Sequence, residues 1–252
     1  MIAFEPTLWA AVVAIALFAG VVKGAVGFAM PMILISGLGT FLPPEVAIAA
    51  MILPTVGSNI LQAMRAGLKQ AFFAMRAHRL YLGIVLVMIM GSAQLVRVVP
   101  GNVIFLLIGT PITLFAITQL LGWRPKIAQH MRRRAEIGVG LFAGFIGGIA
   151  GSWGPPTVLY LTALNTPKRE AVQIQGVVYG AGSLVLLAAH LNSGVFAGER
   201  VALSALLCVP GGLGMLAGFW LQDRLDQERF RQLTLIVLVV AGANLIRRGV
   251  FG

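Results

Sequence analysis

The stretch GGIAGSWGPPTVLYL, residues 147–161, decides the fold, because it places four glycines and two prolines inside an apolar run. Glycine and proline are the residues that least support the interior of a helix. The residues on both sides have the composition of membrane-buried helix, so an ordinary surface loop does not explain the stretch. It therefore predicts a helix that is interrupted within the membrane.

The composition also indicates a membrane protein. Of the 252 residues, 58% are hydrophobic and 11% are charged, whereas soluble domains carry about 25% charged residues. The apolar residues form long blocks rather than the short alternating strands of outer-membrane barrels. The N-terminal sequence MIAFEPTLWA lacks a basic region before its apolar block, so we expect this block to be retained rather than cleaved as a signal peptide.

Long apolar blocks and short ones have different roles in this pattern. The long blocks can each cross a hydrocarbon core of about 30 Å, and they are residues 46–64, 80–96, 102–121, 171–190, 201–221 and 231–247. The short blocks form two pairs, 8–22 with 31–42 and 137–149 with 156–164. A glycine-rich break joins the two members of each pair.

The two breaks correspond, because Gly27 and Gly151, 124 residues apart, stand in the same local pattern. The other pairs at this spacing are Gly20 with Gly144, Gly24 with Gly148, Pro31 with Pro155, and Pro43 with Pro167. The chain is therefore expected to contain a first membrane repeat (1–122), a basic cytoplasmic linker (123–135) and a second membrane repeat (136–252).

The predicted fold is all-α: a polytopic membrane protein of two homologous repeats, each with a glycine/proline-broken helix pair plus three transmembrane helices. Each pair could cross the membrane once, which makes the repeats parallel, or form a re-entrant hairpin, which makes them inverted. The inverted arrangement gathers more Lys and Arg residues on one side, as the positive-inside rule requires. We therefore prefer the inverted arrangement, which places both termini outside the cytoplasm.

The net charge of +11 has two interpretations, nucleic acid or lipid. The cluster WRPKIAQHMRRR, residues 123–134, lacks the aromatic residues and motifs of nucleic-acid binding. In a membrane chain such clusters lie in cytoplasmic loops and meet anionic lipids. We therefore expect a lipid bilayer as partner and no nucleic acid, while the sequence allows a homo-oligomer without specifying one.

Paired broken helices in two repeats point to a central transport site. Pro31, Pro155 and Pro156 stand where the second helix of each pair should begin, and proline suits a first helical turn. Ser152 could cap the same end of the second pair. Helix N-termini that start at the breaks offer free N–H groups to an anion. The alternative is that the glycines only allow close helix packing, which explains Gly24 and Gly148 as well as a site does.

Side chains near the breaks are candidates for lining the site. Lys23 is a cation well inside an apolar block, so it could bind an anion or extend its ammonium group to the headgroups. Polar residues on the following helices could donate to an oxyanion or join helices, and they are Ser58, Asn59, Gln62, Gln173, Gln175, Tyr179 and Ser183. Phe28 and Trp153 lie within the breaks, where they could line the cavity or fill space.

Several functional classes lack the residues that they need. Cys208 is the single cysteine, the three histidines are far apart, and no Asp or Glu lies in the middle of a block. We therefore expect no metal, no cofactor and no enzymatic activity, since a nucleophile–base pair or metal cluster is missing. An anion that leaves a negative-inside cell gains about 2.3 kcal/mol per charge per 100 mV, so export needs no other driving force.

Two segments, GVVKGAVGFAMPMILISGLGTFLPPEVAIA (20–49) and GFIGGIAGSWGPPTVLYLTALNTPKREAV (144–172), resemble the paired signatures of the sulfite exporter TauE/SafE family of membrane transporters. The resemblance covers essentially the whole chain. It implies a multi-pass transporter of the inner (plasma) membrane for sulfite, sulfoacetate or a related organosulfonate. Its motif residues fall here on Gly24, Gly27, Pro31, Gly148, Gly151, Gly154, Pro155 and Pro156.

The resulting hypothesis is export of a small sulfur-containing anion through a site between the two breaks. The alternatives are uptake or channel conduction of another small anion, and a membrane scaffold that transports nothing. The expected substrate-binding residues are Lys23, Gly24, Gly27, Phe28, Pro31, Asn59, Gly148, Gly151, Ser152, Trp153, Gly154, Pro155, Pro156, Gln175, Tyr179 and Ser183.

Overall fold

A computed structural model describes residues 5–66, 73, 75–123, 125–222, 224 and 226–251. All elements within these residues are helices, seven of them long and apolar enough to cross a membrane. The seven candidate spans are Pro6–Val26, Pro44–Met64, Arg79–Arg97, Gly101–Leu120, Gln173–Ser193, Glu199–Gln222 and Glu228–Phe251. The all-α, multi-pass membrane architecture is thereby confirmed.

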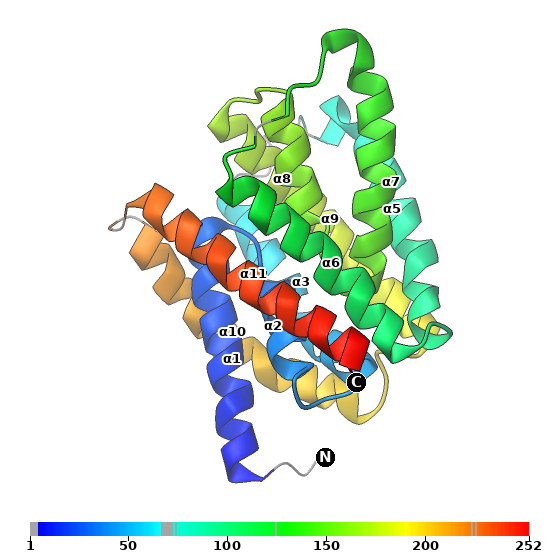
Figure 1. Cartoon of the computed structure of the whole chain (residues 1–252), viewed down its shortest axis with the longest axis vertical. Coiled ribbons are helices and arrows are strands. Elements are labelled where there is room, and N and C mark those ends of the chain that lie inside the picture. Colours follow the sequence, from blue (N-terminus) through cyan, green and yellow to red (C-terminus); the bar gives the residue numbers. More distant parts are fainter. Residues whose placement is uncertain are drawn as a thin grey trace.

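The helices follow one another in the same order in the two halves of the chain (Figure 1). The first half contains α1 (Pro6–Val26), α2 (Met30–Leu38), α3 (Pro44–Ala66), α5 (Arg79–Ser92) with the short η1 (Ala93–Arg97), and α6 (Gly101–Leu120). The second half contains η2 (Gln129–Met131), α7 (Arg132–Ala150), α8 (Gly154–Ala163), α9 (Lys168–Ser193), α10 (Glu199–Gln222) and α11 (Gln227–Phe251).

The first helix of each broken pair is longer than its apolar block suggested. Helix α1 has 21 residues and α7 has 19, whereas α2 and α8 have only 9 and 10. Helix α1 extends mainly at its inner end, through Lys23 to Val26, whereas α7 extends mainly at its outer end, where residues 132–136 are largely charged. Helix α7 already begins at Arg132, so the last residues assigned to the linker, 132–135, belong to this helix.

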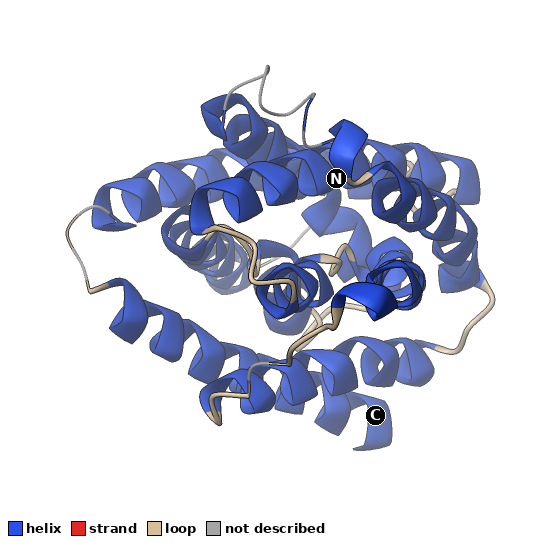
Figure 2. Ribbon diagram, turned by 90° about the horizontal axis from the view of Figure 1, so that it is seen from above, coloured by secondary structure: helices blue, strands red, loops and turns tan. Residues whose placement is uncertain are grey.

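The two halves exchange their first helices. Helix α1 packs along α10 of the second half, and α7 packs along α5 of the first half. Helices α3 and α9 contact each other, as do α6 and α11, so both halves contribute to each of these pairs. Seen from above, long helices surround a central group that includes loop segments (Figure 2).

Glycines let these exchanged helices approach to backbone contact. A Cβ atom on Gly20 or Gly24 of α1 would collide with backbone atoms of α10, at Gly211 and Met215 respectively. On α7, a Cβ atom on Gly144 would lie 2.7 Å from the carbonyl oxygen of Val85 in α5, and one on Gly148 would lie 2.5 Å from that of Ile89. For Gly24 and Gly148 the packing alternative therefore explains the glycine.

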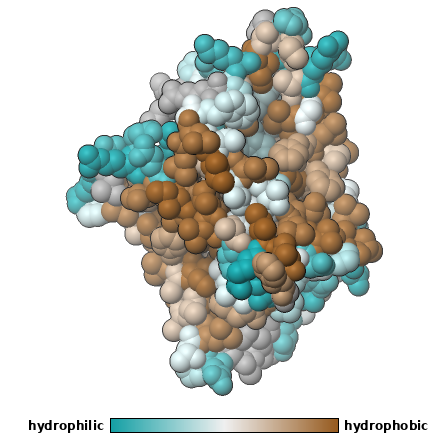
Figure 3. All heavy atoms as spheres, viewed as in Figure 1, coloured by the Kyte–Doolittle hydropathy of each residue, from teal (hydrophilic) through white to brown (hydrophobic). Residues whose placement is uncertain are grey.

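The outer surface has the distribution of polarity that a bilayer requires. Hydrophobic residues cover most of the centre of the face shown in Figure 3, and hydrophilic residues gather at its upper end, at its left edge and in its lower part. Exposed apolar side chains such as Val87, Val209 and Leu233 lie on the candidate spans. In water such a surface would aggregate, whereas in lipid it is the ordinary surface of a spanning helix.

Candidate functional site

Left-handed backbone conformations end the first helix of each pair. Gly27 has φ 86° and its N–H donates to the carbonyl of Lys23 at 2.8 Å; Gly151 has φ 63° and its N–H donates to the carbonyl of Gly147 at 2.7 Å. Ala29 is also left-handed, with φ 82°, although it carries a side chain. Glycine adopts this conformation without the steric cost that a Cβ atom brings. The glycines at positions 27 and 151 therefore explain why α1 and α7 end there.

Prolines stand in the first turn of each short helix, as predicted. Helix α2 begins at Met30 with Pro31 in its first turn, and α8 begins at Gly154 with Pro155 in its first turn. The expected cap of α8 was wrong. The residue at the cap position is Trp153, and the hydroxyl of Ser152 donates instead to the carbonyl of Ala150 at 3.2 Å.

The two breaks meet around one small cavity of about 20 Å³. Its lining residues come from both pairs and from the helices that follow them: Lys23, Phe28, Ala29, Pro31, Met32, Asn59, Gly151, Trp153, Gly154 and Tyr179. This volume accommodates about one water molecule. The described conformation is therefore nearly closed at the point where the two halves of the chain converge.

Lys23 is the charged group of this cavity, and its side chain is almost completely buried, with 3% exposed. Its Nζ donates to Oδ1 of Asn59 at 2.5 Å and to the carbonyl of Gly27 at 3.1 Å, and it lies 5.1 Å from the centre of the Tyr179 ring. All three partners are neutral. Among the described residues, no carboxylate forms an ion pair with Lys23.

Hydrogen bonds across the two halves hold these partners in position. Nδ2 of Asn59 in α3 donates to the carbonyl of Tyr179 in α9 at 3.2 Å, which turns Oδ1 of the same amide toward Lys23. The Tyr179 hydroxyl in turn donates to the carbonyl of Gly154 at 3.2 Å, at the start of α8. Lys23 is thus connected through one chain of bonds to the second break.

Trp153 lies in a space that two glycines create. A Cβ atom on Gly147 would lie 2.8 Å from the indole ring, and one on Gly182 would lie 3.2 Å from it. Gly147 is the residue that corresponds to Lys23 in the other half. At equivalent positions, the first half therefore carries the cation Lys23, and the second half carries Gly147, which has no side chain and leaves room for the indole of Trp153.

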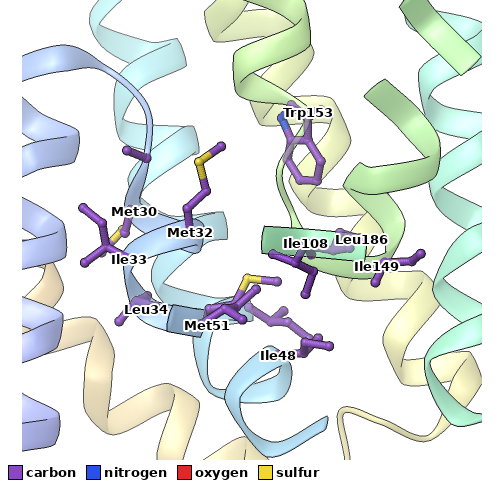
Figure 4. Close-up of a cluster of buried hydrophobic side chains, with 14 of the residues drawn as sticks. Met30, Met32, Ile33, Leu34, Ile48, Met51, Ile108, Ile149, Trp153 and Leu186 are labelled. Carbon is purple, nitrogen blue, oxygen red and sulfur yellow. The ribbon is translucent and has the colours of Figure 1, made fainter. Parts of the chain in front are cut away.

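Apolar side chains pack beside the cavity at Gly151, where an added Cβ atom would lie 3.0 Å from the Met51 methyl group and 3.5 Å from Leu186. Figure 4 shows Met51, Ile48 and Leu186 in the buried cluster that also contains Trp153. Ile48 and Met51 precede Asn59 on α3, and Leu186 follows Tyr179 on α9, so they lie toward the start of α3 and the end of α9. The opposite direction is more polar, because Gln62 lies beside Gly27.

Half of the expected binding residues line this cavity: Lys23, Phe28, Pro31, Asn59, Gly151, Trp153, Gly154 and Tyr179. The other half do not line it, and these are Gly24, Gly27, Gly148, Ser152, Pro155, Pro156, Gln175 and Ser183. Gly27 still contributes its carbonyl to Lys23, whereas the Ser183 hydroxyl donates to Gly180 in its own helix at 2.9 Å.

Two lining residues, Ala29 and Met32, were not expected from the sequence. Ala29 carries no polar group, and its position between Gly27 and Pro31 was the available signal. Met32 stands one residue beyond Pro31 and is apolar, so nothing distinguished it from core. No group of three or more His, Cys, Asp or Glu residues within the described ranges could hold a metal ion.

The geometry defines a class of protein: a helical membrane protein in which two broken helix pairs enclose a buried cationic cavity. The model of the sulfite exporter TauE/SafE family matches residues 12–245 of the chain, so the chain belongs to this transporter family. Neither the comparison with curated proteins nor the comparison with solved structures gives a match.

Proposed function

We propose that this protein exports a small sulfur-containing anion, sulfite or an organosulfonate such as sulfoacetate, and binds it in the cavity between the two breaks. The observation that carries the proposal is Lys23, a buried cation with neutral partners only. An ionised group in a low-dielectric interior is costly unless an opposite charge accompanies it. A bound anion supplies this charge, and family membership supports transport of it.

Main-chain groups support the same site. The cavity is lined by Ala29 and Pro31 at the start of α2 and by Trp153 and Gly154 at the start of α8. The first N–H groups of a helix have no partner within that helix, and its N-terminus carries a partial positive charge. Two such ends and one ammonium group form an environment suited to an oxyanion.

The proposal includes an inverted repeat with re-entrant pairs. Exchanging the two halves converts the contact of α1 with α10 into that of α7 with α5, which supports a twofold relationship. The start of α1 and the end of α11 both lie toward the lower end of the view in Figure 1, which agrees with an even total of crossings, whether each half crosses three times or four. In the inner membrane, residues 123–131 would face the cytoplasm and its anionic lipids.

Transport requires that the cavity open alternately to the two sides. With room for about one water molecule, the described conformation is too small for an oxyanion of four or more heavy atoms. Rocking of one repeat against the other around a central site is the usual way in which inverted repeats achieve alternating access. Export would then separate the buried apolar residues Ile48, Met51 and Leu186, which pack between the cavity and the ends of α3 and α9 that we assign to the outer side.

Flux into and out of proteoliposomes tests the proposal. We expect labelled sulfite or sulfoacetate to cross faster with the protein than without it, and the rate to follow an imposed membrane potential. Lys23→Met should reduce the flux by about 30-fold or more, since loss of a buried charge partner costs about 2 kcal/mol at least. Lys126→Met, in the exposed segment after α6, is the matched control and should retain wild-type flux.

Two outcomes would contradict the proposal. If no small oxyanion crosses under either polarity of the potential, the protein does not transport such anions, and the scaffold alternative gains support. If Lys23→Met and Lys126→Met both retain full flux, transport takes place but the site does not lie at Lys23.

A further inference from the structure

A second, larger cavity lies on the other side of the α8 N-terminus. Its volume is about 490 Å³, within the range of ordinary ligand sites. Helices α6, α7 and α8 form its walls, and the residues that matter here are Phe115, Val139, Phe142, Pro155 and Leu159. Phe142 is half exposed, so the cavity opens on the outer surface between α6 and α7, where lipid surrounds the protein.

One aromatic pair separates this apolar cavity from the Lys23 cavity. The ring of Phe28, which lines the Lys23 cavity, meets the ring of Phe115, which lines the apolar cavity, edge to face at 6.3 Å between centroids. The chain of the second break completes the partition. Trp153 and Gly154 line the Lys23 cavity, whereas Pro155 lines the apolar one.

We propose that the apolar cavity binds the hydrocarbon portion of a transported organic anion whose sulfonate group lies at Lys23. This inference rests on the proposed function and specifies its substrate class as sulfonates with an apolar chain. At about 20 Å³ the Lys23 cavity must widen to admit even the sulfonate head group, whereas the adjoining free volume is already about 490 Å³ and apolar. Rotation of the Phe28 ring away from Phe115 joins the two cavities.

Continuity with the cationic site distinguishes this occupant from the other candidates. A lipid acyl chain in the cavity would have its head group at the membrane surface rather than at Lys23. A second copy of the chain would cover the exposed rim at Phe142. It would give no reason for the apolar cavity to adjoin the Lys23 cavity through the Phe28–Phe115 pair. An anion with a hydrocarbon chain uses both the ammonium group and the apolar walls.

Binding of a homologous series tests the inference. Ethane-, butane- and hexanesulfonate are titrated by calorimetry into the protein in nanodiscs, with empty nanodiscs as the blank. We expect the dissociation constant to fall about fourfold for each added methylene that is buried, which corresponds to about 0.8 kcal/mol. Hexanol, which has the chain without the charge, should not bind measurably.

A cavity-filling variant locates the effect. Val139→Trp places an indole in the apolar cavity, and we expect it to remove most of the gain from ethane- to hexanesulfonate while sulfite flux persists. Leu159→Phe is a second, milder filling variant. Val209→Trp is the matched control, because Val209 lies on α10 with 66% of its surface exposed and does not line this cavity. It should retain the full chain-length dependence.

The inference and the proposed function fail in different ways. Sulfite flux with equal affinity for all three sulfonates would overturn the inference and leave anion transport intact. A chain-length dependence that Val139→Trp does not reduce would also overturn it, and would assign the cavity to a lipid chain or, if the oligomeric state changes, to a second copy. Absence of flux with chain-length-dependent binding would overturn the transport proposal and leave the apolar cavity as a binding site for the chain of an anion that is not transported.

Discussion

The two breaks share a backbone but differ in their side chains. In both, a left-handed glycine ends a long helix and a proline stands in the first turn of a short one. The first break carries the ammonium group of Lys23, and the second carries the indole of Trp153 above Gly147. The backbone conformation sets where helix N-termini converge, and the side chains differentiate the two halves. A site built this way has one cation and one apolar wall.

The largest expected difference between the breaks concerns Trp153, which is nearly completely buried. Trp153→Ala should lower the free energy of unfolding by about 3–5 kcal/mol, because the glycines around the indole cannot close the space it leaves. Trp220→Ala on α10, where the indole is 55% exposed, should lower it by less than about 1 kcal/mol. Unfolding by SDS in mixed micelles measures both, and a loss for Trp153→Ala as small as that expected for Trp220→Ala would show that Trp153 is not required for packing of the second break.

The glycines that end α1 and α7 should differ by a smaller amount. Gly27→Ala and Gly151→Ala each place a Cβ on left-handed backbone, at about 1–2 kcal/mol. At Gly151 the new Cβ would also lie 3.0 Å from the Met51 methyl group, whereas at Gly27 the nearest atom, on Gln62, is 3.4 Å away. We expect Gly151→Ala to cost about 1 kcal/mol more. The same SDS unfolding assay measures both free energies of unfolding. A larger loss of stability for Gly27→Ala than for Gly151→Ala would contradict the geometry of the second break.

The smallest effect belongs to Ala29, whose left-handed conformation has no counterpart at Trp153. Ala29→Gly should raise the free energy of unfolding by about 0.5 kcal/mol, since relief of steric strain exceeds the added chain entropy. Ala49→Gly in the interior of α3 is the control and should lower it by about 1 kcal/mol. Destabilisation by both substitutions would mean that Ala29 is not strained.

Much of the fold follows from the sequence because hydropathy and backbone chemistry are local properties. The six long blocks, the two breaks and the prolines in the first turns of α2 and α8 were all predictable on these grounds. The ends of α1 and α7 were not, since these helices extend beyond their apolar blocks. The repeat and the re-entrant topology stay predictions.

The residues of the site were predictable from the sequence only where their polarity differs from that of the residues around them. Lys23 and Asn59 are polar residues in apolar helices, and they do meet. Gly24 and Gly151 look alike in sequence, yet one packs on α10 and the other lines the cavity, because the distinction depends on the neighbouring helix. Met32 and Ala29 carry no such signal, and the apolar cavity between α6, α7 and α8 arises only from tertiary packing.

The contact of α1 with α10 also sets the order of events during synthesis. Gly20 meets Gly211, a residue that the ribosome adds 191 positions later. At about 5–20 residues per second, α1 waits about 10–40 s in the membrane before its packing partner exists. Throughout this interval lipid or an insertion factor must cover the face of α1 that carries Gly20 and Gly24, so assembly of the two halves is a late event rather than the docking of two finished domains.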